Sequence, residues 1–178
     1  MRVIRENGGE EDEVFMDRSV AIASDHAGFE QKRQLVEWML RKGIDVHDLG
    51  PYNDERVDYP DFAVLVAREV SKGMARMGVL VCGTGIGMAM TANKFSGIRA
   101  ANVTAPHFAE LAREHNDANI ITLSGRFVGL ETNKGILEAF LSTPFGQGRH
   151  AERVQKITAI ERDQKDQKAD QKADNDRR

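Results

Sequence analysis

Residues 79–88 read Val-Leu-Val-Cys-Gly-Thr-Gly-Ile-Gly-Met, and the rest of the chain is best interpreted outward from this stretch. Its three leading apolar residues, two of them β-branched, predict a short buried strand that ends at Cys82. Three glycines follow at alternate positions, and residues 88–94 have the composition of a helix. A strand, a glycine-rich turn and a helix together present backbone N–H groups to an anion. The stretch therefore predicts a site for an anion or an oxyanion beside a thiol.

Cys82 is the only cysteine in the sequence, and the residues alone leave two interpretations open. A free cysteine at a strand end is most often a small buried hydrophobe. A thiol near a positive dipole is instead more readily ionised, which makes it a usable base or nucleophile. A dinucleotide site is disfavoured, because Met88 occupies the position of the third glycine and the following strand, near Asn102, lacks the acidic residue such sites use. We therefore expect no nicotinamide cofactor.

The composition is typical of a globular protein, with 40% hydrophobic and 30% charged residues among 178. A net charge of −3 gives no indication of general nucleic-acid binding. No apolar run approaches the ~20 residues of a membrane span, and the acidic start of the chain lacks the apolar core of a signal peptide. A single cysteine fits a reducing compartment. These features predict a cytoplasmic protein without membrane or nucleic-acid partners.

Apolar, β-branched stretches alternate along the chain with segments of helical spacing. Strands are expected at 20–23, 45–49, 79–82, 99–103 and 119–123, and helices at 29–42, 60–72, 88–94, from 106, 131–141 and 150–160. Such alternation requires parallel strands joined by right-handed crossover helices. The fold class is therefore α/β, a three-layer sandwich whose five-stranded parallel sheet has helices on both faces.

Composition also divides the chain into three regions. Residues 1–17 contain the acidic block Glu10–Glu13 and are expected to form a flexible extension. Residues 18–161 hold the predicted domain. Residues 162–178 form a charged, repetitive tail, which could either extend the last helix or stay disordered.

Polar residues follow several of the predicted strands. Ligands of open parallel sheets bind at the carboxyl ends of the strands. The predicted strand exits carry Asp25-His26, Cys82-Gly83-Thr84-Gly85, Thr104 and Ser124-Gly125-Arg126. This convergence favours the functional interpretation of Cys82. Taken singly, Asp25 is better interpreted as a helix cap, and His115 as a histidine at a helix C-terminus.

Two arginines lie four residues apart on the last predicted helix. Arg149 and Arg153 would share one face of that helix. With Arg126 they could form a phosphate clamp, because arginine forks match phosphate oxygens. A solvated helix face is the alternative interpretation.

Six motifs in order are similar to one known family. They are Ser24-Asp25-His26-Ala27-Gly28, Asp58-Tyr59-Pro60, Cys82-Gly83-Thr84-Gly85-Ile86-Gly87, Ala92-Asn93-Lys94-Phe95-Ser96-Gly97-Ile98-Arg99-Ala100, Arg113-Glu114-His115-Asn116-Asp117 and Gly148-Arg149-His150. Together they resemble the type B ribose-5-phosphate isomerases, which are related to the galactose-6-phosphate isomerase subunits. The resemblance covers about Ser19 to Glu161.

The resemblance implies a Rossmann-like fold and a homodimer, or a dimer of dimers, whose active sites draw on two subunits. It implies no metal and no cofactor. The implied activity is an aldose–ketose isomerase of the pentose phosphate pathway that interconverts D-ribose 5-phosphate and D-ribulose 5-phosphate. Alternatives are an isomerase of allose 6-phosphate or galactose 6-phosphate, and a non-catalytic sugar-phosphate sensor.

The same resemblance implies roles for individual residues. Cys82 would be the base that moves a proton between C1 and C2 of the sugar, and the amides of Gly83, Thr84, Gly85, Ile86 and Gly87 would hold the enediolate oxygen. His115 would open the furanose ring with Asp25 and Thr84 nearby, and Asn116 would bind sugar hydroxyls. The phosphate or the distal end of the sugar would be surrounded by His26, Arg126, Arg149 and Arg153. His107 departs from the family, in which an aromatic residue is expected.

Overall fold

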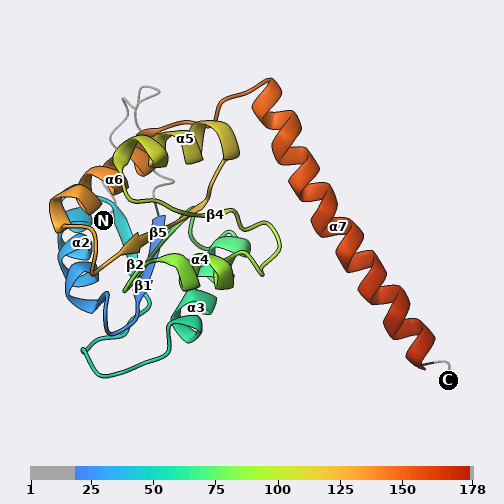
Figure 1. The fold of residues 1–178 in the computed structure, drawn as a ribbon, viewed down its shortest axis with the longest axis horizontal. Coiled ribbons are helices and arrows are strands. Elements are labelled where there is room, and N and C mark those ends of the chain that lie inside the picture. The colour runs from blue at the N-terminus through green and yellow to red at the C-terminus, as the bar shows by residue number, and fades with distance from the viewer. Residues whose placement is uncertain (1–18, 177–178) are drawn as a thin grey trace, which may run out of the picture.

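A five-stranded parallel sheet forms the centre of the computed structural model, which describes residues 19–176 (Figure 1). The strands are β1 (Ser19–Ser24), β2 (Asp45–Asp48), β3 (Met77–Cys82), β4 (Ala100–Asn102) and β5 (Ile120–Ser124). Their order across the sheet is β2-β1-β3-β5-β4, and every neighbouring pair is parallel. The fold class predicted from the alternating pattern is therefore confirmed.

Helices cover both faces of this sheet. They are α2 (Phe29–Arg41), α3 (Tyr59–Ser71), α4 (Ile86–Ala92), α5 (Pro106–Asn116), α6 (Leu130–Ser142) and α7 (Arg149–Asp176). Figure 1 shows α2, α5 and α6 on one side of the sheet and α3 and α4 on the other. The three-layer arrangement explains why β3 and β5, which are covered on both faces, are buried at every position.

Two apolar clusters fill the spaces between these layers. One joins strand residues such as Val79 and Ile121 to Leu35 of α2 and Ile136 of α6. The other joins alternate strand residues, Cys82 among them, to α3 and α4. Neighbouring residues of a strand point to opposite faces, so each strand feeds both clusters. Cys82 therefore belongs to the layer beneath α4.

Several boundaries differ from those predicted. Helix α4 begins at Ile86, two residues before the predicted start, and β4 spans three residues where five were expected. The last helix runs through 28 residues, from Arg149 to Asp176, instead of ending near 160. The charged repeat thus continues the helix as far as Asp176, one of the two forms left open for it. The predicted extension over 1–17 lies outside the described residues.

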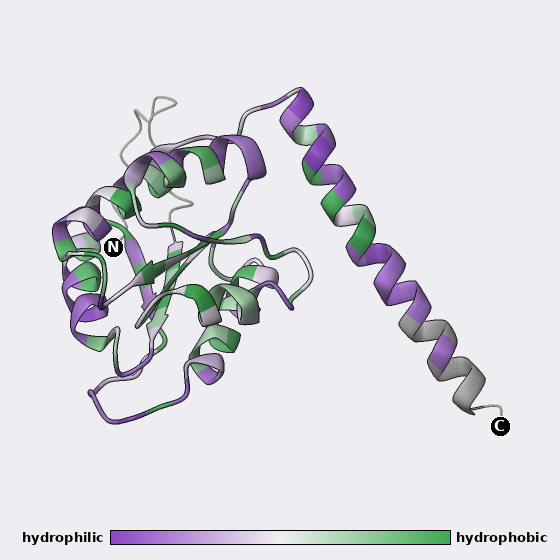
Figure 2. Ribbon diagram, viewed as in Figure 1, coloured by the Kyte–Doolittle hydropathy of each residue, from purple (hydrophilic) through white to green (hydrophobic). Residues whose placement is uncertain are grey.

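Helix α7 projects away from the body of the molecule (Figure 1), and Figure 2 shows hydrophobic residues among hydrophilic ones in its first half. Its first half is tied to the body by Glu161, whose carboxylate accepts hydrogen bonds from Ser96 Oγ (3.1 Å) and Gly97 N (2.9 Å). Ile157 and Ile160 of this helix are 41% and 58% exposed. Across the described part of the chain, no helix has the length and apolarity needed to cross a membrane.

Candidate functional site

Cys82 ends β3 at the carboxyl edge of the sheet, in contact with a backbone amide. The residue is 5% exposed, and Gly85 N donates a hydrogen bond to its Sγ over 3.1 Å. Gly85 has a φ of 80°, and a Cβ there would lie 2.1 Å from Asn102 Nδ2. Only glycine fits this turn, because the backbone is left-handed and the space is occupied. The turn thus places an N–H donor against the sulfur.

Neighbouring strand ends hold the glycine loop in place. Ser124 Oγ donates to Gly83 O over 2.8 Å, and Asn102 Nδ2 donates to Thr84 O over 3.2 Å. Arg126 lies beside this loop, since a Cβ on Gly83 would be 3.5 Å from Arg126 Cδ. Sequence reasoning gave Asn102 and Ser124 no role, although both end strands at the predicted ligand edge.

The residues that follow β1 pack against β3. Asp25 is 8% exposed, and its Oδ1 accepts a hydrogen bond from Gly28 N over 2.9 Å. Gly28 precedes α2 as its N-cap residue, so the Asp25 carboxylate closes the turn before the helix. A Cβ on Gly28 would lie 2.3 Å from Val81 O, which makes this contact possible for glycine alone. Asp25 is thereby held at the same edge as Cys82.

His26 follows β1 and Tyr59 begins α3, and both lie at this edge beside the segment that joins β2 to α3. His26 Nδ1 lies 3.1 Å from Val57 O, which fixes the imidazole against that segment. The Tyr59 ring covers the glycine loop, because a Cβ on Gly87 would be 2.6 Å from its Cε2 and Cζ atoms. Sequence reasoning quoted Tyr59 in a motif without assigning it to the site. Its place at the N-terminus of a helix that follows a strand was the available signal.

We call the residues gathered at this carboxyl edge the Cys82 group. It consists of Asp25, His26, Tyr59, Cys82, Gly83, Thr84, Gly85, Ile86, Gly87 and Arg126. Thr84 is exposed and Ile86 is 50% exposed, so the outer side of the loop is accessible.

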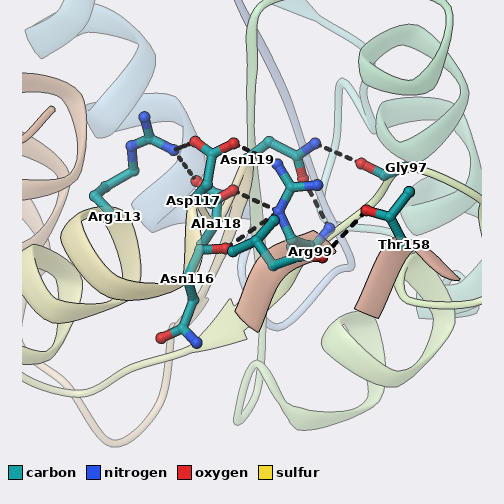
Figure 3. A network of polar contacts seen from close by, with 9 residues as sticks. Gly97, Arg99, Arg113, Asn116, Asp117, Ala118, Asn119 and Thr158 are labelled. Carbon is teal, nitrogen blue, oxygen red and sulfur yellow. Dashed lines mark hydrogen bonds and ion pairs between the residues drawn. The ribbon is translucent and has the colours of Figure 1, made fainter. Parts of the chain in front are cut away.

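A second set of predicted site residues lies where α5 ends. Asp117 has a φ of 47°, a left-handed conformation that is uncommon outside glycine. Its carboxylate accepts hydrogen bonds from Arg99 Nη2 (2.6 Å) and Arg113 Nη1 (2.8 Å), as Figure 3 shows. The two guanidinium groups fix the turn at Asp117, and this turn sets the direction of the preceding Asn116. The Asn116 side chain points away from the network (Figure 3).

His115 is stacked on a histidine of α7. The rings of His115 and His150 have centroids 4.2 Å apart and an interplanar angle of 5°. Arg149 and Arg153, the proposed clamp, are exposed and lie on the same first turns of α7. Desolvation lowers the pKa of His150, and the charges of His115, Arg149 and Arg153 lower it further against the opposing charge of Glu114. We call His115, Asn116, Arg149, His150 and Arg153 the His115 group.

The two groups lie at opposite edges of the sheet within one chain. Cys82 is level with Ser124, the last residue of β5. Asn116 precedes β5, and its carbonyl oxygen accepts a hydrogen bond from Arg99 Nε (3.1 Å), just before β4 begins. A strand rises about 3.3 Å per residue, so the ends of the five-residue β5 alone are about 13 Å apart. One chain therefore does not bring Arg126 together with Arg149 and Arg153.

The two groups suit different parts of one reaction. The Cys82 group offers a sulfur base beside backbone donors, which suits proton removal next to a developing oxyanion. The His115 group offers imidazoles and guanidinium groups, which suit proton transfer and phosphate binding. Among the residues whose side chains the structure describes, no group of three or more histidine, cysteine, aspartate or glutamate side chains is placed to hold a metal ion.

The sequence matches the family model described as Ribose/Galactose Isomerase over residues 20–157. Among curated relatives, ribose-5-phosphate isomerase B of Escherichia coli (strain K12) is 44% identical over 144 residues, which are 81% of this chain and 97% of the relative. The probable ribose-5-phosphate isomerase B of Mycoplasma pneumoniae is 45% identical over 149 residues, which are 83% of this chain and 98% of the relative.

Solved structures share the fold. Ribose 5-phosphate isomerase of Thermotoga maritima superposes with a TM-score of 0.78 at 50% identity, covering 79% of this chain and 97% of that one. A structure of ribose-5-phosphate isomerase B from Mycoplasma genitalium with bound ribulose-5-phosphate gives a TM-score of 0.78 at 45% identity, covering 81% and 96%. These similarities confirm the resemblance that the six motifs indicated.

Proposed function

This chain belongs to the Ribose/Galactose Isomerase family, and we propose that it interconverts D-ribose 5-phosphate and D-ribulose 5-phosphate within the pentose phosphate pathway of the cytoplasm. The names of its relatives support this substrate pair. The observation that carries the proposal is the contact between Gly85 N and Cys82 Sγ, because it joins a candidate base to a row of amide donors.

Cys82 would act as the base on the open-chain sugar. Its thiolate takes the proton from C2 of the aldose and returns it to C1, while the proton of the C2 hydroxyl passes to O1, so the aldehyde becomes a ketone through an enediolate. The proton α to a carbonyl is weakly acidic, so its removal needs both a poised base and a stabilised oxygen anion. The amides of the Gly83–Gly87 loop would stabilise the oxygen anion.

His115 would open the furanose ring before this proton transfer. Ring opening takes the proton from the hydroxyl at C1 and gives one to the ring oxygen, a task suited to an imidazole. Asp25 and Thr84 would flank the opened sugar, and Asn116 would bind its hydroxyls. The phosphate would be held by His26, Arg126, Arg149 and Arg153, and this remote binding energy would orient the reacting carbons.

Such a site needs two copies of the chain. The Cys82 group and the His115 group lie at opposite edges of one sheet, so a complete site would take one group from each subunit of a homodimer, or of a dimer of dimers. Exposed apolar side chains support an interface along two helices. They are Ile86 and Met90 on α4 and Ile157 and Ile160 on α7.

Ketose formation by the purified protein tests the proposal. The protein is supplied with ribose 5-phosphate, allose 6-phosphate and galactose 6-phosphate at equal concentrations, with Cys82→Ala as the matched inactive control. We expect the highest kcat/KM with ribose 5-phosphate. Faster turnover of a 6-phosphohexose would transfer the assignment to that sugar. Tight binding of all three without turnover would identify a sensor.

A further inference from the structure

Two imidazole rings of the His115 group form one flat stack. The 5° interplanar angle and the 4.2 Å centroid separation mean that the His150 ring is stacked on one face of His115. Contacts this flat fix the plane of both rings, whereas an isolated imidazole at the end of a helix rotates about χ1 and χ2. His115 is 38% exposed in its side chain, so the other parts of its ring remain open to a ligand.

The chain between α6 and α7 passes beside the His150 ring. Gly146 N donates to Glu114 O over 2.8 Å, which ties this segment to the residue before His115. A Cβ on Gly146 would lie 3.4 Å from His150 Cδ2 and 2.9 Å from Glu114 O. Nδ1 of His150 is enclosed and has no hydrogen-bond partner within the described residues. Packing, more than hydrogen bonding, therefore sets the orientation of His150.

The charges around His150 favour its neutral form. Desolvation and the nearby His115, Arg149 and Arg153 all lower its pKa, while Glu114 acts in the opposite direction. A neutral His150 lets His115 gain and lose a proton without a second positive charge stacked against it. His150 also follows Arg149 directly in the sequence, so the residue stacked on His115 is next to one arginine of the predicted phosphate clamp.

We propose that His150 is a positioning residue for ring opening, which holds the His115 imidazole in the plane it needs while the adjacent Arg149 binds the phosphate. The inference rests on the proposed function and deepens it, because it assigns a task to a residue that would not itself touch the reacting atoms. A direct role as a phosphate ligand is the competing interpretation.

Only one of the two substrates forms a ring, so ring opening can be measured separately from proton transfer. Ribulose 5-phosphate has a ketone at C2 and a phosphate on O5, so it cannot close a furanose ring and is always open-chain. Ribose 5-phosphate is mostly cyclic. An enzyme that cannot open rings draws on the small open-chain fraction, and its rate stops rising with enzyme concentration once spontaneous ring opening becomes limiting.

The test compares His150→Ala with His150→Phe, which keeps a flat ring for stacking. The forward rate is measured at increasing enzyme concentration, with His115→Ala as the reference for lost ring opening and His47→Gln as the control for losing a histidine elsewhere. With ribose 5-phosphate as substrate, we expect the rate of His150→Ala to reach a plateau as the enzyme concentration rises. Its rate per subunit should then be roughly tenfold or more below that of wild type. The rates of His150→Phe and His47→Gln should stay proportional to enzyme concentration. Every variant except His115→Ala should keep its KM within about threefold of the wild-type value.

An NMR measurement reports on the stack without using activity. The ring current of a stacked aromatic shifts the His115 Cε1–H resonance, so this shift should be lost in His150→Ala and kept in His150→Phe. A proportional forward rate for His150→Ala would overturn the inference, and so would a raised KM shared by both variants, which would make His150 a phosphate ligand. A wild-type protein without isomerase activity would instead overturn the proposed function, whatever the NMR spectra show.

Discussion

The amide of Gly85 donates a hydrogen bond to Cys82 Sγ across 3.1 Å, in a turn that only glycine can form. This contact turns a buried cysteine into a candidate base.

Replacing Cys82 with alanine should lower kcat by about 10²–10⁴, the usual value of general-base catalysis. Binding of ribose 5-phosphate, measured by calorimetry, should change little, because the remaining donors and arginines are untouched. Cys82→Ser is the control that preserves volume, and it should also be impaired, since a hydroxyl is a far weaker acid than a thiol. Turnover close to wild type in Cys82→Ala would remove Cys82 from the mechanism.

Mixing two inactive variants tests whether the site is shared. Cys82→Ala and Arg149→Ala chains, unfolded and refolded together, should recover up to about one quarter of wild-type activity. Half of randomly paired dimers are mixed, and one of the two sites in each mixed dimer has both residues intact. Refolding each variant alone is the control. If mixed dimers are present and inactive, Cys82 and Arg149 serve the same site from one chain.

The ion pair between His47 and Glu69 should make stability depend on pH. Glu69 Oε2 lies 2.9 Å from His47 Nδ1, and this hydrogen bond raises the pKa of His47 against an opposing desolvation. A pKa that is raised on folding stabilises the folded protein fully below the unfolded value, about 6.5, and the contribution is lost as the pH rises through the folded value. Glu69→Gln should therefore lower Tm more at about pH 5.5 than at about pH 8.5.

A matched control for this pH dependence is Glu110→Gln. Glu110 faces His107, whose side chain is 73% exposed, so water screens that pair and its loss should leave Tm nearly unchanged at both pH values. An equal fall in Tm at both pH values for Glu69→Gln would show that Glu69 contributes packing instead of charge.

Removal of residues 162–178 should leave activity and oligomeric state unchanged. Glu161 is the α7 side chain that bonds to Ser96 and Gly97, and it remains in the truncated chain. Residues 162–167 are exposed, so little burial is lost. Glu161→Ala is the comparison that should lower Tm, because it removes both bonds. Dissociation or inactivity of the truncated protein, measured by light scattering and assay, would contradict this.

Much of the fold could be predicted because periodicity and burial are local properties of the sequence. The run from Val79 to Cys82 is apolar throughout, and β3 is buried at every position. The length of α7 could not be predicted, because Asp, Gln, Lys and Ala form helices or remain solvated with nearly equal ease. The strand β4 was predicted, but its three-residue length was not, since tertiary pairing with β5 decides where it ends.

The sequence indicated candidate site residues but not how they are arranged in space. The glycine loop and Cys82 adjoin in sequence, so their contact could be foreseen. The stack of His115 on His150 joins residues 35 positions apart, one on α5 and the other on α7. No local sequence pattern predicts a contact of that kind. Tyr59 was overlooked because its closeness to Gly87 arises only when α3 packs beneath the loop.

The placement of Cys82 and His115 at opposite edges of one sheet bears on how such a protein can evolve. If each complete site draws one group from each of two copies, every inherited change in either group is felt at both sites of the assembly, and neither site can vary alone. A duplicated gene removes that restriction. One descendant could then lose its thiol and the other its histidines while the pair still formed one working site, so two partners that depend on each other would arise from a protein that pairs with itself.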